Sequence, residues 1–170
     1  GKRKMSRLDS MIRRLSAQRL CIHYGLDLIS DLGGPVLELG LGNGRTYDHL
    51  REHSRGREIF VFERRPAAHP SCTPEPQFLF EGDFRETLKE AAGTLSPPAA
   101  FAHCDIGSGV SENDRALGIA IAAPLNDLLT PGAVVLSDQE LYVEQWSAID
   151  LPNGVSEGRY FLYRKFEQRS

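Results

Sequence analysis

The residues best suited to chemistry lie in one short segment, residues 36–46. A short apolar run that contains an acid, Glu38, is followed by three glycines at alternating positions, Gly40, Gly42 and Gly44. Glycine lets the backbone turn sharply and approach a ligand closely, and open α/β sheets bind ligands beyond the carboxyl ends of their strands. The pattern predicts a ligand-binding loop between a buried strand and a helix, although such turns also occur without a ligand.

The spacing of the glycines separates two classes of cofactor. A dinucleotide fingerprint, Gly-x-Gly-x-x-Gly, requires its third glycine where this chain has Arg45. Glu38-x-Gly40-x-Gly42-x-Gly44 instead resembles the first motif of class I S-adenosylmethionine (SAM)-dependent methyltransferases. The resemblance implies that this loop contacts SAM through Glu38, the three glycines, Leu41 and Asn43.

The resemblance extends to the next predicted strand, which ends at Glu63. In that family the acid at this place accepts hydrogen bonds from both ribose hydroxyls, and a carboxylate suits a diol because it has two oxygens. Glu63 and the adjacent Arg64 are therefore expected to contact the cofactor. The alternative is that Glu63 is a surface carboxylate paired with Arg64 or Arg65.

A third match is Asp83-Phe84, which resembles the family's Gly-Asp-hydrophobic turn that holds adenine. Asp83 is also well placed to cap the helix that follows, and both roles stay open. Residues 128–135 resemble the family's turn into the fifth strand, with Ala133 in place of a second glycine.

The chemistry implied by the resemblance is direct transfer of the SAM methyl group by in-line displacement. The fourth strand faces the methyl in that family, so Asp105 at its end is the first candidate for a base and a further cofactor contact. Asp138, after the fifth strand, is a weaker candidate for the base. His103 is predicted to be structural, and Cys104 to be a small buried apolar residue.

The elements that must position these residues alternate between strands and helices, which predicts a mostly parallel sheet with helices on both faces. We expect a Rossmann-like three-layer α/β sandwich, with seven strands of which the last is antiparallel. The predicted strands are 35–39, 58–63, 77–80, 99–104, 133–136, 147–151 and 159–166. The predicted helices are 6–31 (or two, broken near Gly25), 45–53, 83–92 and 111 to about 129. Residues 64–76 are predicted to be loop, and Ser111 with Asp114 a capping box.

The chain of 170 residues is expected to form one domain, with a helical N-terminal lid over 1–33 and a SAM-binding core over 34–170. A net charge of −3 excludes a protein that binds nucleic acid through its overall charge. Seven basic side chains against one acid in residues 1–19 indicate a solvated helix face or a patch for an anionic substrate, RNA included.

Three widely spaced cysteines predict neither a disulfide framework nor a metal-ligand cluster, so no metal is expected and the location is predicted to be cytoplasmic. The longest apolar run has ten residues, which predicts no membrane span. Because little is added to the core, we expect a small-molecule acceptor, with a homo-oligomer possible. The alternatives are a non-catalytic SAM-binding regulatory module and a nicotinamide-dependent oxidoreductase.

Overall fold

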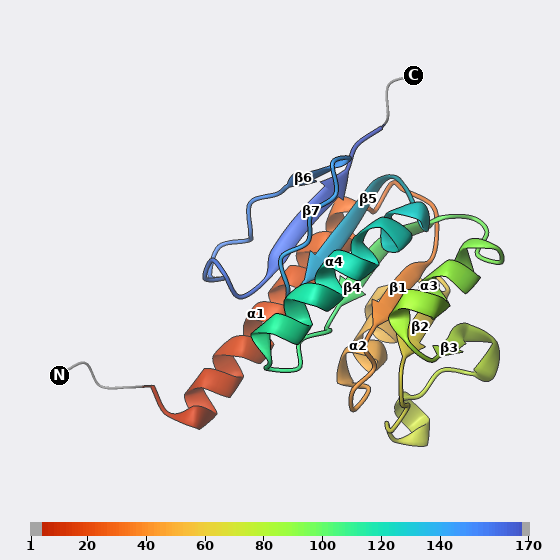
Figure 1. The fold of residues 1–170 in the computed structure, drawn as a ribbon. Coiled ribbons are helices and arrows are strands. Elements are labelled where there is room, and N and C mark those ends of the chain that lie inside the picture. Colours follow the sequence, from red (N-terminus) through yellow and green to blue (C-terminus); the bar gives the residue numbers. More distant parts are fainter. Residues whose placement is uncertain (1–4, 168–170) are drawn as a thin grey trace.

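The structure, a computed structural model, describes residues 5–167. Its centre is a seven-stranded sheet in the order β3-β2-β1-β4-β5-β7-β6 (Figure 1). Strands β1 to β5 run parallel to one another, whereas β7 pairs antiparallel with both β5 and β6. The predicted Rossmann-like sandwich with an antiparallel last strand is confirmed.

The strands are β1 (Val36–Leu39), β2 (Ile59–Glu63), β3 (Leu79–Glu81), β4 (Ala99–Cys104), β5 (Leu129–Ser137), β6 (Trp146–Ala148) and β7 (Phe161–Lys165). The helices are α1 (Arg7–Leu28), α2 (Arg45–His53), α3 (Phe84–Ala92) and α4 (Ser111–Asp127). Two short 3₁₀ turns, η1 (Pro70–Cys72) and η2 (Pro76–Phe78), lie between β2 and β3. None of the helices described is long and apolar enough to cross a membrane.

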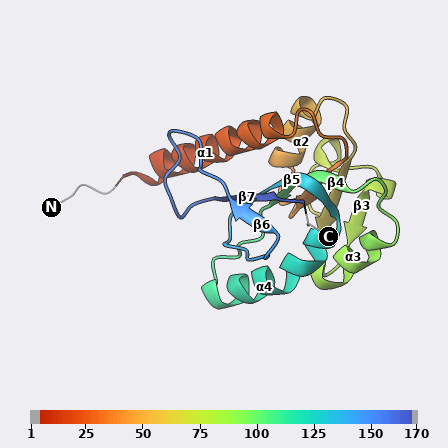
Figure 2. The same cartoon turned by 90° about the horizontal axis from the view of Figure 1, so that it is seen from above.

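Helices cover both faces of the sheet, with α1 and α2 on one side and α3 and α4 on the other (Figure 2). Every residue of β1 and β4 is buried as a result. This is why these strands appear in the sequence as short apolar runs rather than as alternating patterns. The apolar residues divide into two core clusters, one under each helical layer.

Helix α1 is continuous, and the break considered near Gly25 does not occur. Gly25 is buried inside the helix, where a Cβ atom would collide with the ring of Phe101 on β4. The glycine therefore serves close packing of α1 on the sheet. The C-terminal half of α1 belongs to the core through Cys21 and Ile22, whereas its N-terminal half projects from the body (Figure 2).

The predicted capping box at the start of α4 is wrong. Ser111 is the first helical residue, and the N-cap position is held by Val110. The Asp114 carboxylate instead accepts hydrogen bonds from the backbone of Ser108 and Gly109 and from the Ser108 hydroxyl. Asp114 therefore satisfies backbone N–H groups of the loop before the helix and not those of the first helical turn.

Other boundaries also differ from the predictions. The segment 64–76 contains η1 rather than loop alone, and the third strand begins at Leu79 because residues 76–78 form η2. Each 3₁₀ turn begins at a proline, whose fixed φ suits a tight turn. Strand β5 is longer than predicted and runs through Pro131 and Gly132, where its pairing with β4 shifts register.

Candidate functional site

The predicted ligand loop follows β1 at the carboxyl edge of the sheet. Its three glycines, Gly40, Gly42 and Gly44, have φ values of 93°, 53° and 86°, a region that disfavours other residues. A Cβ at Gly40 would collide with the backbone carbonyl of Asp105, so this glycine lets β1 and β4 end side by side. At Gly42, among residues 5–167, no atom lies within 4 Å of the Cβ position, so this part of the loop faces open space.

The loop lies at the point where the chain changes sides of the sheet. Helix α2, which leaves β1, packs on one face, whereas α4, which leaves the neighbouring β4, packs on the other (Figure 2). Such a switch point opens a crevice beyond the carboxyl ends of the two strands. The loop and Asp105 directly follow β1 and β4, and Glu63 is the last residue of β2, so all three lie at this edge of the sheet.

Glu63 is bound to the glycine loop in the structure. Its Oε1 accepts hydrogen bonds from the backbone N–H groups of Leu41 (3.0 Å) and Gly42 (3.2 Å). Its Oε2 accepts one from Arg65 (3.0 Å). A carboxylate has about four acceptor positions, two on each oxygen. Three are therefore occupied, and one position on Oε2 is left for a ligand.

Asp83 and Phe84 lie at one wall of a cavity of about 400 Å³. Asp83 caps α3, since its Oδ1 accepts a hydrogen bond from the backbone N–H of Arg85 at 2.8 Å. The helix-cap role is thus observed, and its Oδ2 lies 3.6 Å from the guanidinium of Arg85, with which it forms an exposed ion pair. The cavity has a size typical of small-ligand pockets, and it is lined by Arg64, Asp83, Phe84, Arg85, Ile106, Ser108, Asn113, Asp114, Ala116 and Leu117.

The two candidate bases, Asp105 and Asp138, have different surroundings. Asp105 is exposed at the end of β4. Asp138 is half-buried, and its two oxygens accept backbone hydrogen bonds from Ile106 (3.1 Å) and Gly107 (2.9 Å). Burial raises the pKa of Asp138, the two backbone N–H groups lower it, and the neighbouring Asp105 raises it further. Asp138 thus holds the loop after β4, and Asp105 is the carboxylate that faces solvent.

Glu38 is fully buried and forms a pair with His103. Glu38 Oε1 lies 2.5 Å from His103 Nδ1, and His103 Nε2 lies 3.4 Å from Gln18 Nε2 on α1. Burial lowers the pKa of His103, but the charge and hydrogen bond of Glu38 raise it above its ordinary 6.5. The second Glu38 oxygen, Oε2, has no hydrogen-bond partner within the described part of the chain. One buried acceptor is therefore available beside the glycine loop.

Two residues of this region were not singled out from the sequence. Gln18 ties α1 to His103, and Tyr160 lies beneath α1, with its hydroxyl 3.5 Å from the carbonyl of Arg14. Burial, together with the charge of Asp105, raises the pKa of Tyr160 to about 12, so its hydroxyl stays protonated. Both contacts span distant parts of the sequence, and no local pattern indicates them.

No cluster of metal ligands was predicted from the sequence, and the structure brings three histidines together. His23 on α1 lies beside His49 and His53 on α2. A usable signal was present in the sequence, because histidines four residues apart on a predicted helix share one face. The third member, His23, comes from α1 and faces the other two histidines.

Comparisons with known proteins agree with this geometry. A family model described as S-adenosyl-L-methionine methyltransferase matches residues 5–165. The crystal structure of an S-adenosyl-L-methionine methyl transferase from Silicibacter pomeroyi DSS-3 is 41% identical, with a TM-score of 0.88. The match covers 95% of this chain and 99% of that one. A search of curated proteins found no match.

More distant structures share the fold. The O-methyltransferase from Bacillus cereus, in complex with SAH, is 16% identical with a TM-score of 0.56, covering 97% of this chain and 92% of that one. Human methyltransferase-like protein 13, also in complex with SAH, is 15% identical with a TM-score of 0.54, covering 94% and 81%. The chain thus belongs to the family of S-adenosyl-L-methionine methyltransferases, and its cofactor is SAM.

Proposed function

We propose that this methyltransferase transfers the methyl group of SAM to a small acceptor that binds between α1 and the start of α2. The observation that carries this proposal is a cavity of about 420 Å³ beside the glycine loop. Its size suits a small molecule rather than a polymer. The cavity is lined by Ile12, Leu15, Ser16, Gln18, Arg19, Ile22, Arg45, Thr46 and His49.

The charge of this cavity favours an acceptor with an anionic group. Arg19 from α1 and Arg45 from α2 both line it, and an arginine side chain binds carboxylate and phosphate groups in a bidentate manner. The apolar side chains Ile12 and Leu15 line the same cavity. Lys2, Arg3 and Lys4, which contribute to the basic patch predicted from the sequence, lie outside the described residues.

We assign the cofactor contacts to the loop 40–44, Glu63, Arg64, Asp83, Phe84 and Asp105. The free acceptor position on Glu63 Oε2 suits one ribose hydroxyl, and Asp83 with Phe84 lines the cavity proposed for adenine. Glu38 is buried beside the loop, and we propose that its unpartnered oxygen is the acceptor for the ammonium group of SAM.

SAM supplies a methyl group on a sulfonium that is already a good leaving group. The task of the chain is to hold the acceptor atom in line with that methyl, since positioning supplies much of the rate. We propose that Asp105 removes a proton from a hydroxyl or ammonium acceptor, because it is exposed at the end of β4. Asp138 fixes the backbone at Ile106 and Gly107, and it is a positioning residue.

We further propose that residues 1–33 act as a lid within one domain of 170 residues, with a cytoplasmic location. The lid is supported by the acceptor cavity, of which α1 forms one wall. The location is supported by Cys21, Cys72 and Cys104, which are all free thiols. Exposed Leu8, Met11 and Ile12 on the projecting half of α1 support a homo-oligomer.

Binding of the cofactor is tested by calorimetric titration with SAM and S-adenosylhomocysteine. Gly42→Arg places a long side chain in the open space above the loop and is expected to abolish binding. Gly56→Arg is the matched control, because Gly56 also has positive φ and open space but lies on the loop between α2 and β2. Equal loss of binding in both folded variants would contradict the assignment of the loop.

The acceptor is tested by transfer of a labelled methyl group from SAM to pools of acidic small molecules, and separately to RNA. We expect label in the small-molecule pools, and Arg45→Gln is expected to raise the KM for the acceptor without changing SAM affinity. Label found in RNA alone would refute the small-molecule proposal. Absence of label in both pools, with SAM bound, would favour the non-catalytic module.

A further inference from the structure

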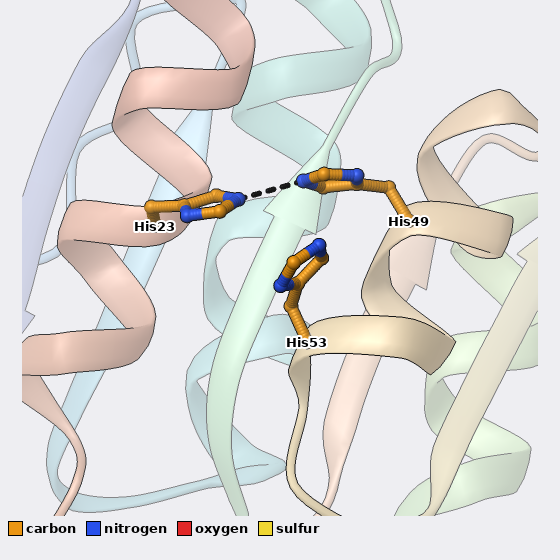
Figure 3. A group of neighbouring side chains, drawn as sticks. All are labelled: His23, His49 and His53. Atoms are coloured by element: carbon orange, nitrogen blue, oxygen red, sulfur yellow. Dashed lines mark hydrogen bonds between the residues drawn. The ribbon is translucent and has the colours of Figure 1, made fainter.

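Three of the five histidines of the chain gather between helices α1 and α2. His49 and His53 lie one turn apart on α2, and His23 reaches toward them from α1 (Figure 3). The ring centroids are 4.9 Å apart for His23 and His49, 4.6 Å for His23 and His53, and 4.2 Å for His49 and His53. One ligand atom from each ring lies within 4.8 Å of the others.

These separations approach those of a tetrahedral metal site. Zinc binds histidine nitrogen at about 2.0–2.1 Å, so two ligand nitrogens in a tetrahedral site lie about 3.3 Å apart. His23 Nε2 and His49 Nε2 are already 2.7 Å apart and share one hydrogen bond. Side-chain rotations that move the nitrogens by about 1 Å would therefore centre an ion between the three rings.

The pKa of His49 is shifted by its surroundings. Burial lowers this pKa most, and the nearby His53 and His23 lower it further. The charged neighbours are Glu52, which raises the pKa of His49, and Arg19, which lowers it.

We propose that His23, His49 and His53 bind one divalent first-row transition ion, of which Zn²⁺ fits best. Three imidazoles leave a fourth coordination position for water, as zinc accepts four ligands. His23 is exposed and the other two are half-buried, so an ion can enter from solvent. The bound ion links α1 to α2, and α2 begins directly after the glycine loop.

Of the three proposed ligands, His49 also lines the proposed acceptor cavity, whereas His23 and His53 do not, and none of the three is a proposed cofactor contact. His23 and His53 line a different cavity, of about 760 Å³, together with Gly33, Gly34 and Glu58. Those residues lie at the amino ends of β1 and β2, the sheet edge opposite to the glycine loop. His23→Ala therefore tests zinc binding without altering the lining of the acceptor cavity.

The test uses tag-free, full-length protein that has been stripped with EDTA and freed of the chelator. Zn²⁺ affinity and stoichiometry are measured by competition with a chromophoric chelator, and Co²⁺ is added as a spectroscopic probe of coordination. His49→Ala and His23→Ala each remove one ligand. His69→Asn is the matched control, because His69 is a surface histidine outside the cluster and asparagine is also a good N-cap.

We expect one Zn²⁺ per chain for the natural protein and for His69→Asn, with the visible absorption of tetrahedral Co²⁺. Loss of an outer partner of a metal ligand already costs 10–100-fold in affinity, so loss of a ligand is expected to cost about 100-fold or more. Zn²⁺ should raise the Tm of the natural protein, because an ion that binds only the folded state stabilises it, and should leave that of His49→Ala unchanged.

Two results would overturn the proposal. One is the absence of a stoichiometric Zn²⁺ in the natural protein. The other is Zn²⁺ affinity in His49→Ala and His23→Ala equal to that of the natural protein. Circular dichroism and SAM titration of each variant establish that the fold and the cofactor site are intact, so that a lost ion is not mistaken for a lost fold.

Discussion

Replacement of Glu63 by glutamine is a direct test of the site geometry. Glu63 accepts three backbone hydrogen bonds and has one acceptor position left for ribose. The isosteric amide keeps its carbonyl for Leu41 and Gly42, which places an NH₂ group against the N–H of Arg65. One donor then faces another, and the charge that strengthens the remaining hydrogen bonds is gone.

The magnitude follows from the hydrogen bond to the cofactor. A hydrogen bond to a charged group contributes about 1.5–3 kcal/mol, which corresponds to roughly 10- to 150-fold in affinity. The new NH₂ can donate to a ribose oxygen and recover part of this. We therefore expect SAM to bind about tenfold or more weakly to Glu63→Gln. The Tm is also expected to fall, because the hydrogen bond from Arg65 is lost and those from Leu41 and Gly42 no longer end on a charged oxygen.

The assay is calorimetric titration with SAM, with thermal unfolding of the same samples. Glu81→Gln is the matched control, because Glu81 is the exposed residue paired with Glu63 across β2 and β3. The control should change neither SAM affinity nor Tm appreciably. Unchanged SAM affinity in Glu63→Gln, or an equal loss in both variants, would refute the assignment of Glu63.

Three further predictions follow from the same region. Gly40→Ala should lower the free energy of unfolding by about 2 kcal/mol or more, since it combines left-handed backbone with a collision at Asp105, while Gly56→Ala, in open space, should cost less in chemical denaturation. The raised pKa of His103 contributes stability that is full below pH 6.5 and is lost as the pH rises through the folded-state pKa. The Tm difference between the natural protein and Glu38→Gln should therefore shrink from pH 6.5 upward, and a constant difference would argue against the ion pair. Asp138→Asn should reduce both stability and methyl transfer because its NH₂ faces the N–H of Ile106 or Gly107. Asp105→Asn should lower kcat by about 10²-fold or more, with SAM affinity and Tm nearly unchanged. If Asp105→Asn and Asp138→Asn had equal effects on kcat and on Tm, the assignment of Asp105 as base and Asp138 as positioning residue would be contradicted.

The central strands and the order of the fold could be predicted from the sequence because their signals are local. Strands β1 and β4 are short apolar runs, and helices α2 and α3 begin and end close to the predicted residues. The glycines at positions 40, 42 and 44 specify a turn whose positive φ values the structure shows. Only a few neighbouring residues decide such features, so the sequence contains them directly.

The ends and breaks of helices were predicted less well where side chains from other parts of the chain contact the backbone or pack against it. The Asp114 carboxylate accepts hydrogen bonds from Ser108 and Gly109 rather than from the first turn of α4, so the capping box predicted from the local sequence does not form. Gly25 suggested a break in α1, whereas the close approach of Phe101 explains the glycine without one. In both cases a tertiary contact overrode the local preference.

The sequence by itself determined the α/β class, the glycine loop and the acids at the strand ends, because period and spacing encode them. Only the tertiary structure decided which of those acids are free. In the folded chain Glu38 is buried and paired with His103, Glu63 accepts hydrogen bonds from the glycine loop, and Asp105 is exposed. The tertiary structure also brought His23 to His49 and His53 across 26 and 30 positions of the sequence. Such contacts depend on how helices pack on a sheet, which no single segment of the sequence specifies.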